Sequence, residues 1–571
     1  MQRIRSIDLD TYVELISTAR GRVHADLYIE DANIINVYTG EIIPSNIAIK
    51  GKHIAYVGLS DRMVGPDTTV VDLKGYYICP GYIEPHSHPN QLYNPDSLAR
   101  FALAHGTTTM INDNRFLYST LNEDQFFGIL NQMNTWPIKM LWWARLDGQV
   151  IEREQDGRFD RDNIHKLLTH PLVVQAGEFS AWPDLLKGDR KIAEVLNEVM
   201  NLGKRVEGHL PGVSLETLCS LSTAGITCDH EAINVREVLD RIRSGLWTTL
   251  RYSSLRPDLP ALVRELASYT ITTNRFMMTL DGSTPGFLQD GFTDFLLKVA
   301  IESGMPPVTA YQMVTINPAT YYGMDGEIGG IAPGRLADLV VLKDITIPKP
   351  VAVMAEGKWV ARDCKLLEHE QWEPIQWEIY GLIQMPLRGI GKLPRIEWST
   401  LPILRMENPV ITRLSNEGNP SDSIKVLFIS RDGHHLVPAL LENMASHLDG
   451  LATTYTLSQG LLTLGRDTYS MQQAIDRVLE IGGGIVLVEN GSVIYELKLP
   501  IYGLMSTESV ESLSKKVKRF EEIMHDRGYP HHEPIWSLFF LTSLNLPDIR
   551  LTPKGVVHVK TRKIIQAPMV L

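Results

Sequence analysis

The segment from Pro80 to His88 ends in two histidines, His86 and His88, that are separated by one residue. If the segment is a strand, residues at i and i+2 point to the same face, so both imidazoles reach one point. Imidazole is the commonest nitrogen ligand of divalent metals in proteins. Two surface histidines before a loop would give the same pattern. The pattern predicts half of a metal site, and the rest of the chain must supply the other ligands.

Eight strand-like segments alternate with helical ones between residue 76 and Thr315. The first ends in the two histidines, and the others are 107–112, 138–143, 172–178, 205–209, 226–230, 247–251 and 276–281. Strands that alternate with helices predict a parallel α/β fold. Eight of them fit a (β/α)8 barrel of the TIM type, whose active site lies at the C-terminal ends of the strands.

Histidines and carboxylates end five of these strands. The candidate metal ligands are His86, His88, Glu178, His209, His230 and Asp281. Each alone could be a capping or surface group, but six at the strand ends of one barrel would converge on its mouth. A histidine and carboxylate set without thiolate suits manganese, iron or zinc.

Three further residues lie at barrel strand ends. Arg251 and Asn112 end the seventh and second strands and are candidate substrate-binding residues. Internal packing or a salt bridge would explain both equally well. His105 precedes the second strand, so it lies at the opposite end of the barrel, where we expect a structural role.

Sequence patterns divide the rest of the chain. Leu9, Tyr12, Val13 and Ile16 have helical spacing and predict a helix laid over the main domain. Short alternating strands then predict a small antiparallel sheet, and strands after the barrel complete it as a β-sandwich into which the barrel is inserted. The expected units are 1–75 (N-terminal helix and first part of the sandwich), 76–330 (barrel), 331–365 (rest of the sandwich), 366–423 (connector) and 424–571 (a C-terminal α+β domain).

Composition excludes several functions. The net charge of −12 over 571 residues argues against nucleic-acid binding, which needs a basic surface. The four cysteines are far apart, so neither a disulfide framework nor a zinc ribbon is expected. No apolar run is long enough to span a membrane, and the N-terminus lacks a signal-peptide core. We expect a cytoplasmic protein, assembled as a homo-oligomer, that acts on a small molecule.

The chain resembles the amidohydrolase superfamily and, within it, the adenine deaminases. The superfamily motifs are Pro-Gly-Tyr-Ile-Glu-Pro-His-Ser-His at 80–88, His-Gly-Thr-Thr-Thr at 105–109, the strand-end His209, His230 and Asp281, and the segments 317–319 and 329–342. The residues around His209 and His230 resemble the fifth- and sixth-strand motifs of adenine deaminases. Segments 481–506 and 551–555 of the C-terminal domain also match and are specific to that family.

The resemblance implies hydrolysis of adenine to hypoxanthine and ammonia at two divalent metals, manganese or iron, as part of purine metabolism. His86 and His88 would hold one metal, and His209 and His230 the other. Glu178 would bridge them, and Asp281 would bind the first metal and act as general base. The two metals would make hydroxide available near neutral pH. Glu231, beside His230, is expected to support the ligands from behind.

Several motifs of the deaminases are altered here. Pro89-Asn90-Gln91 stands in place of their Glu-Ser-Ser run, and Asn112–Arg115 replaces their Asp-Pro-His-Glu sequence. The eighth strand ends in a single carboxylate, Asp281, and the seventh reads Arg251-Tyr252-Ser253-Ser254 instead of Arg-Glu-Gly-Ser. The alternatives to adenine as the substrate are therefore another amino-heterocycle, or a cyclic amide or N-acyl compound. A barrel kept only for assembly is disfavoured, because all six ligand positions are intact.

Overall fold

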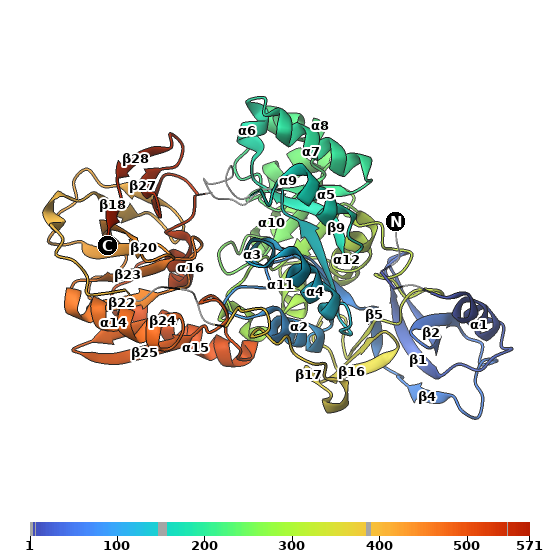
Figure 1. Cartoon of the computed structure of the whole chain (residues 1–571). Helices are drawn as coiled ribbons and strands as arrows, with labels where there is room; N and C mark the ends of the chain where they lie inside the picture. The colour runs from blue at the N-terminus through green and yellow to red at the C-terminus, as the bar shows by residue number, and fades with distance from the viewer. Residues whose placement is uncertain (1–3, 6, 147–156, 384–386, 388–389, 545) are drawn as a thin grey trace.

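The computed structural model describes residues 4–5, 7–146, 157–383, 387, 390–544 and 546–571. Residues 1–3 and 6 of the expected N-terminal region and residues 384–386 and 388–389 of the expected connector lie outside the described residues. Figure 1 shows three units side by side, with a barrel between an N-terminal β-sheet unit and a C-terminal domain.

Eight parallel strands form the barrel. In order around it they are β13 (Phe276–Thr279), β12 (Trp247–Arg251), β11 (Cys228–Asp229), β10 (Arg205–Gly208), β9 (Val173–Phe179), β8 (Lys139–Ala144), β7 (Thr107–Asn112) and β6 (Tyr82–Ser87). A parallel bridge between Ser87 and Asp281 closes the ring. Every residue of β6, β7, β8 and β12 is buried, as expected for strands with covered faces. The predicted barrel is confirmed.

Helices cover the outside of the barrel, and several begin at a side-chain cap, such as Asn94 before α2 and Asn122 before α4. They are α2 (Pro95–Ala104), α3 (Arg115–Thr120), α4 (Glu123–Met133), α5 (Arg161–Thr169), α6 (Trp182–Leu186), α7 (Arg190–Asn201), α8 (Leu215–Thr223), α9 (Val235–Arg243), α10 (Leu259–Leu266), η1 (Phe287–Asp290), α11 (Thr293–Glu302), α12 (Pro307–Met313) and α13 (Ile316–Tyr321).

The N-terminal unit is one curled sheet of nine strands built from both sides of the barrel sequence. Its strands are β1 (Leu27–Asn36), β2 (Glu41–Lys50), β3 (His53–Gly58), β4 (Thr69–Asp72), β5 (Tyr77–Pro80), β14 (Leu339–Leu342), β15 (Ala352–Ala355), β16 (Lys358–Arg362) and β17 (Lys365–Leu366). The pairing of β5 with β14 joins the two parts. Before the barrel, β1 to β3 follow the antiparallel expectation, whereas β4 and β5 both pair with β1 in parallel. The strands after the barrel are antiparallel.

Gly81 divides the segment that leads to His86 and His88 into two strands. β5 belongs to the outer sheet, and β6 belongs to the barrel. A Cβ atom at Gly81 would lie 2.2 Å from Oγ1 of Thr108, so the close approach of β7 requires glycine here. One short run of sequence therefore joins the outer sheet to the strand that carries His86 and His88.

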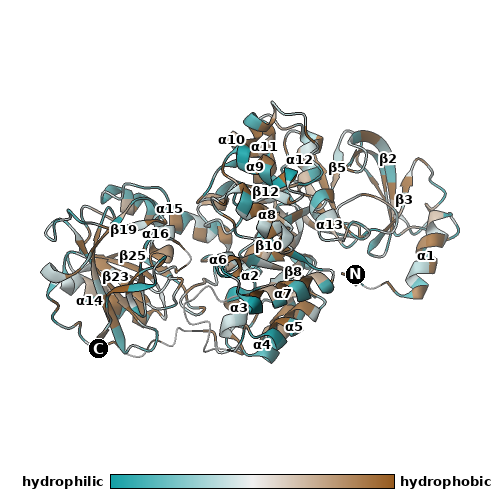
Figure 2. Ribbon diagram, turned by 90° about the horizontal axis from the view of Figure 1, so that it is seen from above, coloured by the Kyte–Doolittle hydropathy of each residue, from teal (hydrophilic) through white to brown (hydrophobic). Residues whose placement is uncertain are grey.

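The N-terminal helix α1 (Leu9–Ala19) forms as expected, but its buried face differs from the expected one. Leu15 and Thr18 are buried, whereas Leu9 is 75% exposed and Tyr12 is 52% exposed. The helix packs against β2 and β3 through the smaller face and lies at the edge of the molecule (Figure 2). Helical spacing fixes which residues share a face but not which face the sheet covers.

The C-terminal domain is a second nine-stranded sheet with a three-stranded sheet and three helices beside it. The large sheet contains β18 (Ile403–Met406), β19 (Thr412–Leu414), β20 (Ile424–Ile429), β21 (His435–Glu442), β22 (Gly450–Thr453), β23 (Leu461–Gly465), β24 (Gly484–Glu489), β25 (Ser492–Lys498) and β29 (Met569–Val570). The other elements are β26 (Ile549–Thr552), β27 (Gly555–His558), β28 (Lys563–Gln566), α14 (Thr468–Glu480), α15 (Val510–Asp526) and α16 (Pro534–Phe540).

The end of the expected connector belongs to this sheet. β18 pairs in parallel with β21 and antiparallel with β19, so the sheet begins near residue 403 and not at 424. β18 is short, and its parallel partner β21 lies more than thirty residues away. Local sequence patterns cannot show such a pairing. The connector before them contains two short 3₁₀ turns, Glu368–Glu370 and Trp398–Thr400.

The C-terminal domain contacts the barrel mouth directly. Leu92 pairs with Met505, and the backbone N–H of Ser506 donates to the carbonyl of Leu92 over 2.6 Å. The indole Nε1 of Trp536, in α16, donates to Oγ of Ser254 over 2.7 Å. The loops after the first and seventh barrel strands are thus held by a domain that follows them by hundreds of residues.

Within the described part of the chain, no helix is long and apolar enough to cross a membrane.

A partly buried carboxyl, Glu533, lies where the C-terminal domain contacts the barrel. Glu533 precedes α16 and accepts a hydrogen bond from Oγ1 of Thr284 over 3.2 Å. Burial, together with the charge of Glu521, raises the pKa of Glu533 from 4.5 to about 8. A carboxyl with a raised folded-state pKa costs stability as the pH rises from its unfolded value to its folded one.

We therefore expect Glu533→Gln to raise the melting temperature relative to the parent protein at about pH 9, and to change it little at about pH 3.5, which is below both pKa values, so that both states hold the proton. Glu522→Gln, on the exposed face of α15, is the matched control. Scanning calorimetry across this pH range measures the effect. An equal pH dependence of the parent and Glu533→Gln would contradict the assignment.

Candidate metal centre

The structure brings all six predicted ligands together at the mouth of the barrel. His86 is in β6 and His88 directly follows it, Glu178 is in β9, His209 and His230 directly follow β10 and β11, and Asp281 lies two residues after β13. Parallel strands end at the same rim, so side chains far apart in sequence face one another. Glu178 and His230 are buried, and the side chain of Asp281 is 18% exposed.

One group of donor atoms comes from β6 and β13. Nε2 of His86 lies 3.2 Å from Nε2 of His88, and Oδ1 of Asp281 lies 3.4 Å and 3.1 Å from these two nitrogens. Ligands that bind one ion at about 2.1 Å stand about 3 to 3.5 Å apart. The three atoms therefore have the spacing of one face of a metal coordination sphere.

A second group lies beside the first. Oε1 of Glu178 is 2.7 Å from Nδ1 of His209 and 3.6 Å from Nε2 of His230. Oε1 of Glu231 is 3.3 Å from each of the same two nitrogens. The other oxygen of Glu178 is 3.9 Å from Nε2 of His88, so this carboxylate reaches both groups.

The donor atoms fit divalent cations. Nδ1 of His209 and Nε2 of His230 are buried and make no hydrogen bond to any described residue, although carboxylate oxygens surround them. Buried polar atoms are normally hydrogen-bonded, so buried nitrogens that face carboxylate oxygens without a well-aligned hydrogen bond indicate a cation site. The combination of imidazole and carboxylate without sulfur is consistent with manganese, iron or zinc.

Glu207 is a functional residue that sequence reasoning did not single out. Its Oε1 lies 3.0 Å from Nδ1 of His86 and 3.1 Å from Nδ1 of His230. Burial alone would raise the pKa of Glu207, but the two histidines lower it to about 2. The carboxylate therefore accepts both Nδ1–H groups and leaves each Nε2 for a metal. Its position two residues before His209, on the same strand face, was the available signal.

Asp113 and Arg145 also belong to the centre. Oδ2 of Asp113 lies 3.2 Å from Nδ1 of His88, and Arg145 Nε donates to Oδ1 of Asp113 over 2.8 Å. Arg145 also donates to Oε2 of Glu178 over 2.7 Å. Burial would raise the pKa of Glu178, but Arg145 and His209 hold it well below its usual range. Both residues directly follow barrel strands, so the strand-end rule would have found them.

The two predicted substrate-binding residues have different positions. Arg251 reaches the mouth, where Nη1 donates to Glu231 over 2.8 Å and to Oδ2 of Asp281 over 3.0 Å. Asn112 does not line the cavity, because its amide is fully buried and donates to the carbonyl of Leu141 over 3.0 Å. The loop after β7 instead presents Asp113 to the mouth. His105 lies at the opposite end of the barrel, as expected.

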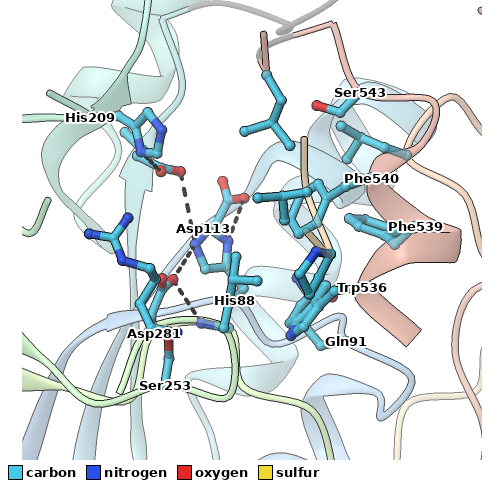
Figure 3. Close-up of a pocket in the computed structure, with 18 of the residues that line it drawn as sticks. His88, Gln91, Asp113, His209, Ser253, Asp281, Trp536, Phe539, Phe540 and Ser543 are labelled. Atoms are coloured by element: carbon cyan, nitrogen blue, oxygen red, sulfur yellow. Dashed lines mark hydrogen bonds and ion pairs between the residues drawn. The ribbon is translucent and has the colours of Figure 1, made fainter. Parts of the chain in front are cut away.

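A cavity of about 630 Å³ lies over the donor atoms. Its floor is formed by charged barrel residues that include His88, Glu178 and Asp281. Figure 3 shows α16 of the C-terminal domain on the opposite side, with aromatic rings turned toward the floor. The apolar side of the cavity is formed by Val410, Ile411, Leu457, Trp536, Phe539 and Phe540.

Comparison with known proteins places both parts of the chain. The amidohydrolase family model matches residues 77–362, and the model of the adenine deaminase C-terminal domain matches residues 404–563. A Halalkalibacterium halodurans protein named "Putative adenine deaminase" is 37% identical over 559 residues, which cover 96% of each chain. The chain belongs to the adenine deaminase family of amidohydrolases. The predicted membership is confirmed.

Other relatives carry the adenine deaminase name as well. The "Adenine deaminase" of Moorella thermoacetica is 29% identical over 580 residues, which cover 97% of each chain. A Bacillus cereus protein named "Putative adenine deaminase" is 36% identical over 568 residues, with 97% of this chain and 96% of that one covered. The relatives match both the barrel and the C-terminal domain that forms the apolar side of the cavity.

Residues that depart from the adenine deaminase motifs surround the cavity of this family member. Gln91, Asp113 and Ser253 all line it. Gln91 accepts a hydrogen bond of 2.6 Å from the hydroxyl of Tyr455 in the C-terminal domain, and Asp113 pairs with His88. The altered motifs therefore act at the cavity wall and at the domain junction, while the donor atoms below are retained.

We expect Glu207→Gln to lower metal affinity by about 10- to 100-fold, because the amide would no longer fix both histidines with Nε2 free for a metal. Metal content after dialysis against a graded chelator, measured by mass spectrometry, tests this. Glu216→Gln, on the exposed surface of α8, is the matched control and should retain full metal content. Unchanged affinity in a folded Glu207→Gln protein would show that Glu207 does not orient the ligands.

Proposed function

We propose that the protein is a metal-dependent aminohydrolase that converts adenine and water to hypoxanthine and ammonia. It is thus a hydrolase of carbon–nitrogen bonds other than peptide bonds. The observation that carries the proposal is the pair of donor groups beneath a cavity closed by a domain of the adenine deaminase type. The names of its relatives support adenine as the substrate.

Two divalent ions would occupy the donor groups, and the family resemblance favours manganese or iron. The residues proposed to hold them are His86, His88 and Asp281 for one, His209 and His230 for the other, with Glu178 between them. Oε1 of Glu231 is close enough to His209 and His230 to join the second group. When bound, the ions lower the pKa of water and stabilise negative charge on the atom under attack.

Asp281 is the proposed proton carrier. Its Oδ1 faces the first donor group and its Oδ2 accepts a hydrogen bond from Arg251, so the carboxylate is fixed between the ligands and the cavity. Burial would raise the pKa of Asp281, but His86 and His88 hold it well below its usual range. The residue is therefore ionised before reaction. It can take a proton from the attacking water and return it to the departing amino group.

Arg251 positions this carboxylate. It forms two hydrogen bonds with Glu231, of 2.8 Å and 3.1 Å, and a third with Asp281. A guanidinium that hydrogen-bonds to two carboxylates limits the rotation of both. Arg145 does the same for Asp113 and Glu178 on the other side of the mouth. The two arginines also offset the negative charge of the carboxylates.

The aromatic side of the cavity fits a flat substrate. Trp536, Phe539 and Phe540 present large apolar surfaces opposite the donor atoms. A purine ring can stack on or meet the edge of such side chains, which are favourable arrangements for aromatic pairs. With a substrate bound, the same side chains would shield the floor from water, which would strengthen electrostatic interactions there.

We expect Asp281→Asn to reduce ammonia release from adenine by on the order of 10²- to 10⁴-fold, since an amide cannot carry the proton. The measurement uses the protein reconstituted with manganese or iron. Asp162→Asn, on the exposed surface of α5, is the control and should keep full activity. Full turnover by a metal-loaded Asp281→Asn protein would contradict the assigned role.

A substrate panel tests the reaction itself. Adenine, other amino-purines and amino-pyrimidines are compared for ammonia release, and cyclic amides and N-acyl compounds for ring opening or acid release. The proposal predicts the highest kcat/KM for adenine. Turnover of amides without ammonia from any amino-heterocycle would assign the metal centre to amide hydrolysis, and the altered residues Gln91, Asp113 and Ser253 would then explain the change.

A further inference from the structure

A second cluster of metal-binding side chains lies at the opposite end of the barrel from the mouth. It consists of His105, Asp294 and Cys364. His105 follows α2 and precedes β7, Asp294 is in the first turn of α11, and Cys364 lies in the turn between β16 and β17. Three elements, two from the barrel and one from the outer sheet, therefore bring a nitrogen, an oxygen and a sulfur donor to one place.

The three donor atoms are close and sheltered. Nδ1 of His105 lies 2.9 Å from Oδ2 of Asp294, and one donor atom from each residue lies within 4.8 Å of the other two. The side chains of His105 and Asp294 are only 12% and 4% exposed. The ring of Phe101 packs against the imidazole with centroids 4.5 Å apart. Low local polarity strengthens the attraction between these donors and a cation.

Local structure fixes the orientation of each donor. Oδ1 of Asp294 accepts the backbone N–H of Phe292 over 2.8 Å, which directs the other oxygen to His105. Cys364 occupies the second position of a two-residue turn in which both residues have positive φ, 47° at Asp363 and 57° at Cys364. Asparagine and glycine are the usual residues of such turns. Here the position carries a thiol beside the imidazole.

We propose that His105, Asp294 and Cys364 form a site for a thiophilic divalent cation of the zinc type. Thiolate and imidazole are the ligands that zinc prefers, and magnesium, calcium and manganese prefer oxygen donors. The donor groups at the barrel mouth contain no sulfur. The two ends of the barrel therefore differ in metal preference, and this site does not depend on the reaction at the mouth.

The proposed cation joins the outer sheet to the barrel. Cys364 comes from the hairpin of β16 and β17, whereas His105 and Asp294 belong to the helical layer of the barrel. Residues at the N-terminal face of such barrels contribute to stability and not to catalysis. An ion bound only by the folded protein adds its binding free energy to folding. Zinc bound at this site should therefore raise the melting temperature of protein already loaded with manganese or iron at the mouth, without changing ammonia release.

Cobalt is the probe for the test, because Co²⁺ bound to thiolate gives an intense sulfur-to-metal absorption band in the near ultraviolet. The full-length protein is exchanged into Co²⁺ and the band is titrated. At saturation we expect a band whose intensity corresponds to about one thiolate–cobalt bond per chain. The band should be lost in Cys364→Ser and kept in Cys219→Ser, which replaces the exposed control cysteine. His105→Gln should weaken cobalt affinity by roughly tenfold or more.

Alkylation gives a second readout that does not need a variant. Zinc should protect Cys364 from iodoacetamide, as judged by peptide mass spectrometry, and should leave the labelling of Cys219 unchanged. A metal centre disrupted at the mouth by Asp281→Asn should keep both the band and the protection. No thiolate band at saturating cobalt, or equal labelling of Cys364 with and without zinc, would overturn the proposal whatever the protein does with adenine.

Discussion

The mouth of the barrel concentrates ionisable side chains that are costly to bury separately. Four histidines and several carboxylates lie within a few ångströms of one another, and most are almost fully buried. Isolated buried charges are strongly unfavourable, so such a group persists only when each charge has a partner. Arg145 and Arg251, with 2% and 4% exposure, supply two of these partners. The donor set is consistent with divalent cations as the remaining ones.

This charge balance explains why the loops at the mouth are so tightly connected. Glu207 accepts hydrogen bonds from Nδ1 of His86 and of His230. Arg145, in the loop after β8, forms ion pairs with Asp113 and Glu178. Arg251 hydrogen-bonds to both Glu231 and Asp281. Each contact fixes a ligand and satisfies a buried polar group at once. The orientation of the donor atoms is therefore built into the protein, which is the condition for tight and selective metal binding.

The two ends of the barrel serve different purposes. At the C-terminal ends of the strands, a domain that begins near residue 403 covers the charged floor with aromatic side chains and hydrogen-bonds to the loops after β6 and β12. At the other end, the outer sheet is joined to the barrel through the β5–β6 junction at Gly81. The chain passes from the outer sheet into the barrel and back again. The first and last residues of the barrel segment are therefore both attached to the same sheet, through the paired strands β5 and β14.

The sequence alone determined the parts of the molecule that follow from local periodicity. Alternation of strands and helices predicted the barrel, and the rule that parallel strands end at one rim placed His86, His88, Glu178, His209, His230 and Asp281 together. The same rule would have placed Asp113 and Arg145, whereas for Asn112 it gave the wrong position. A strand-end residue can turn into the sheet instead of the mouth, and only the packing of Leu141 beside Asn112 decides this.

Only the tertiary structure decided what requires contacts between distant segments. The pairing of β18 with β21, the parallel pairing of β4 with β1 and the exposed face of α1 depend on neighbours that local spacing does not encode. The apolar side of the cavity comes from the C-terminal domain, whose α16 begins more than four hundred residues after the first two histidines. The sequence identified the chemistry of the donor atoms because ligand types and strand ends are local. The shape of the cavity above them is set by how two domains pack, which is not local.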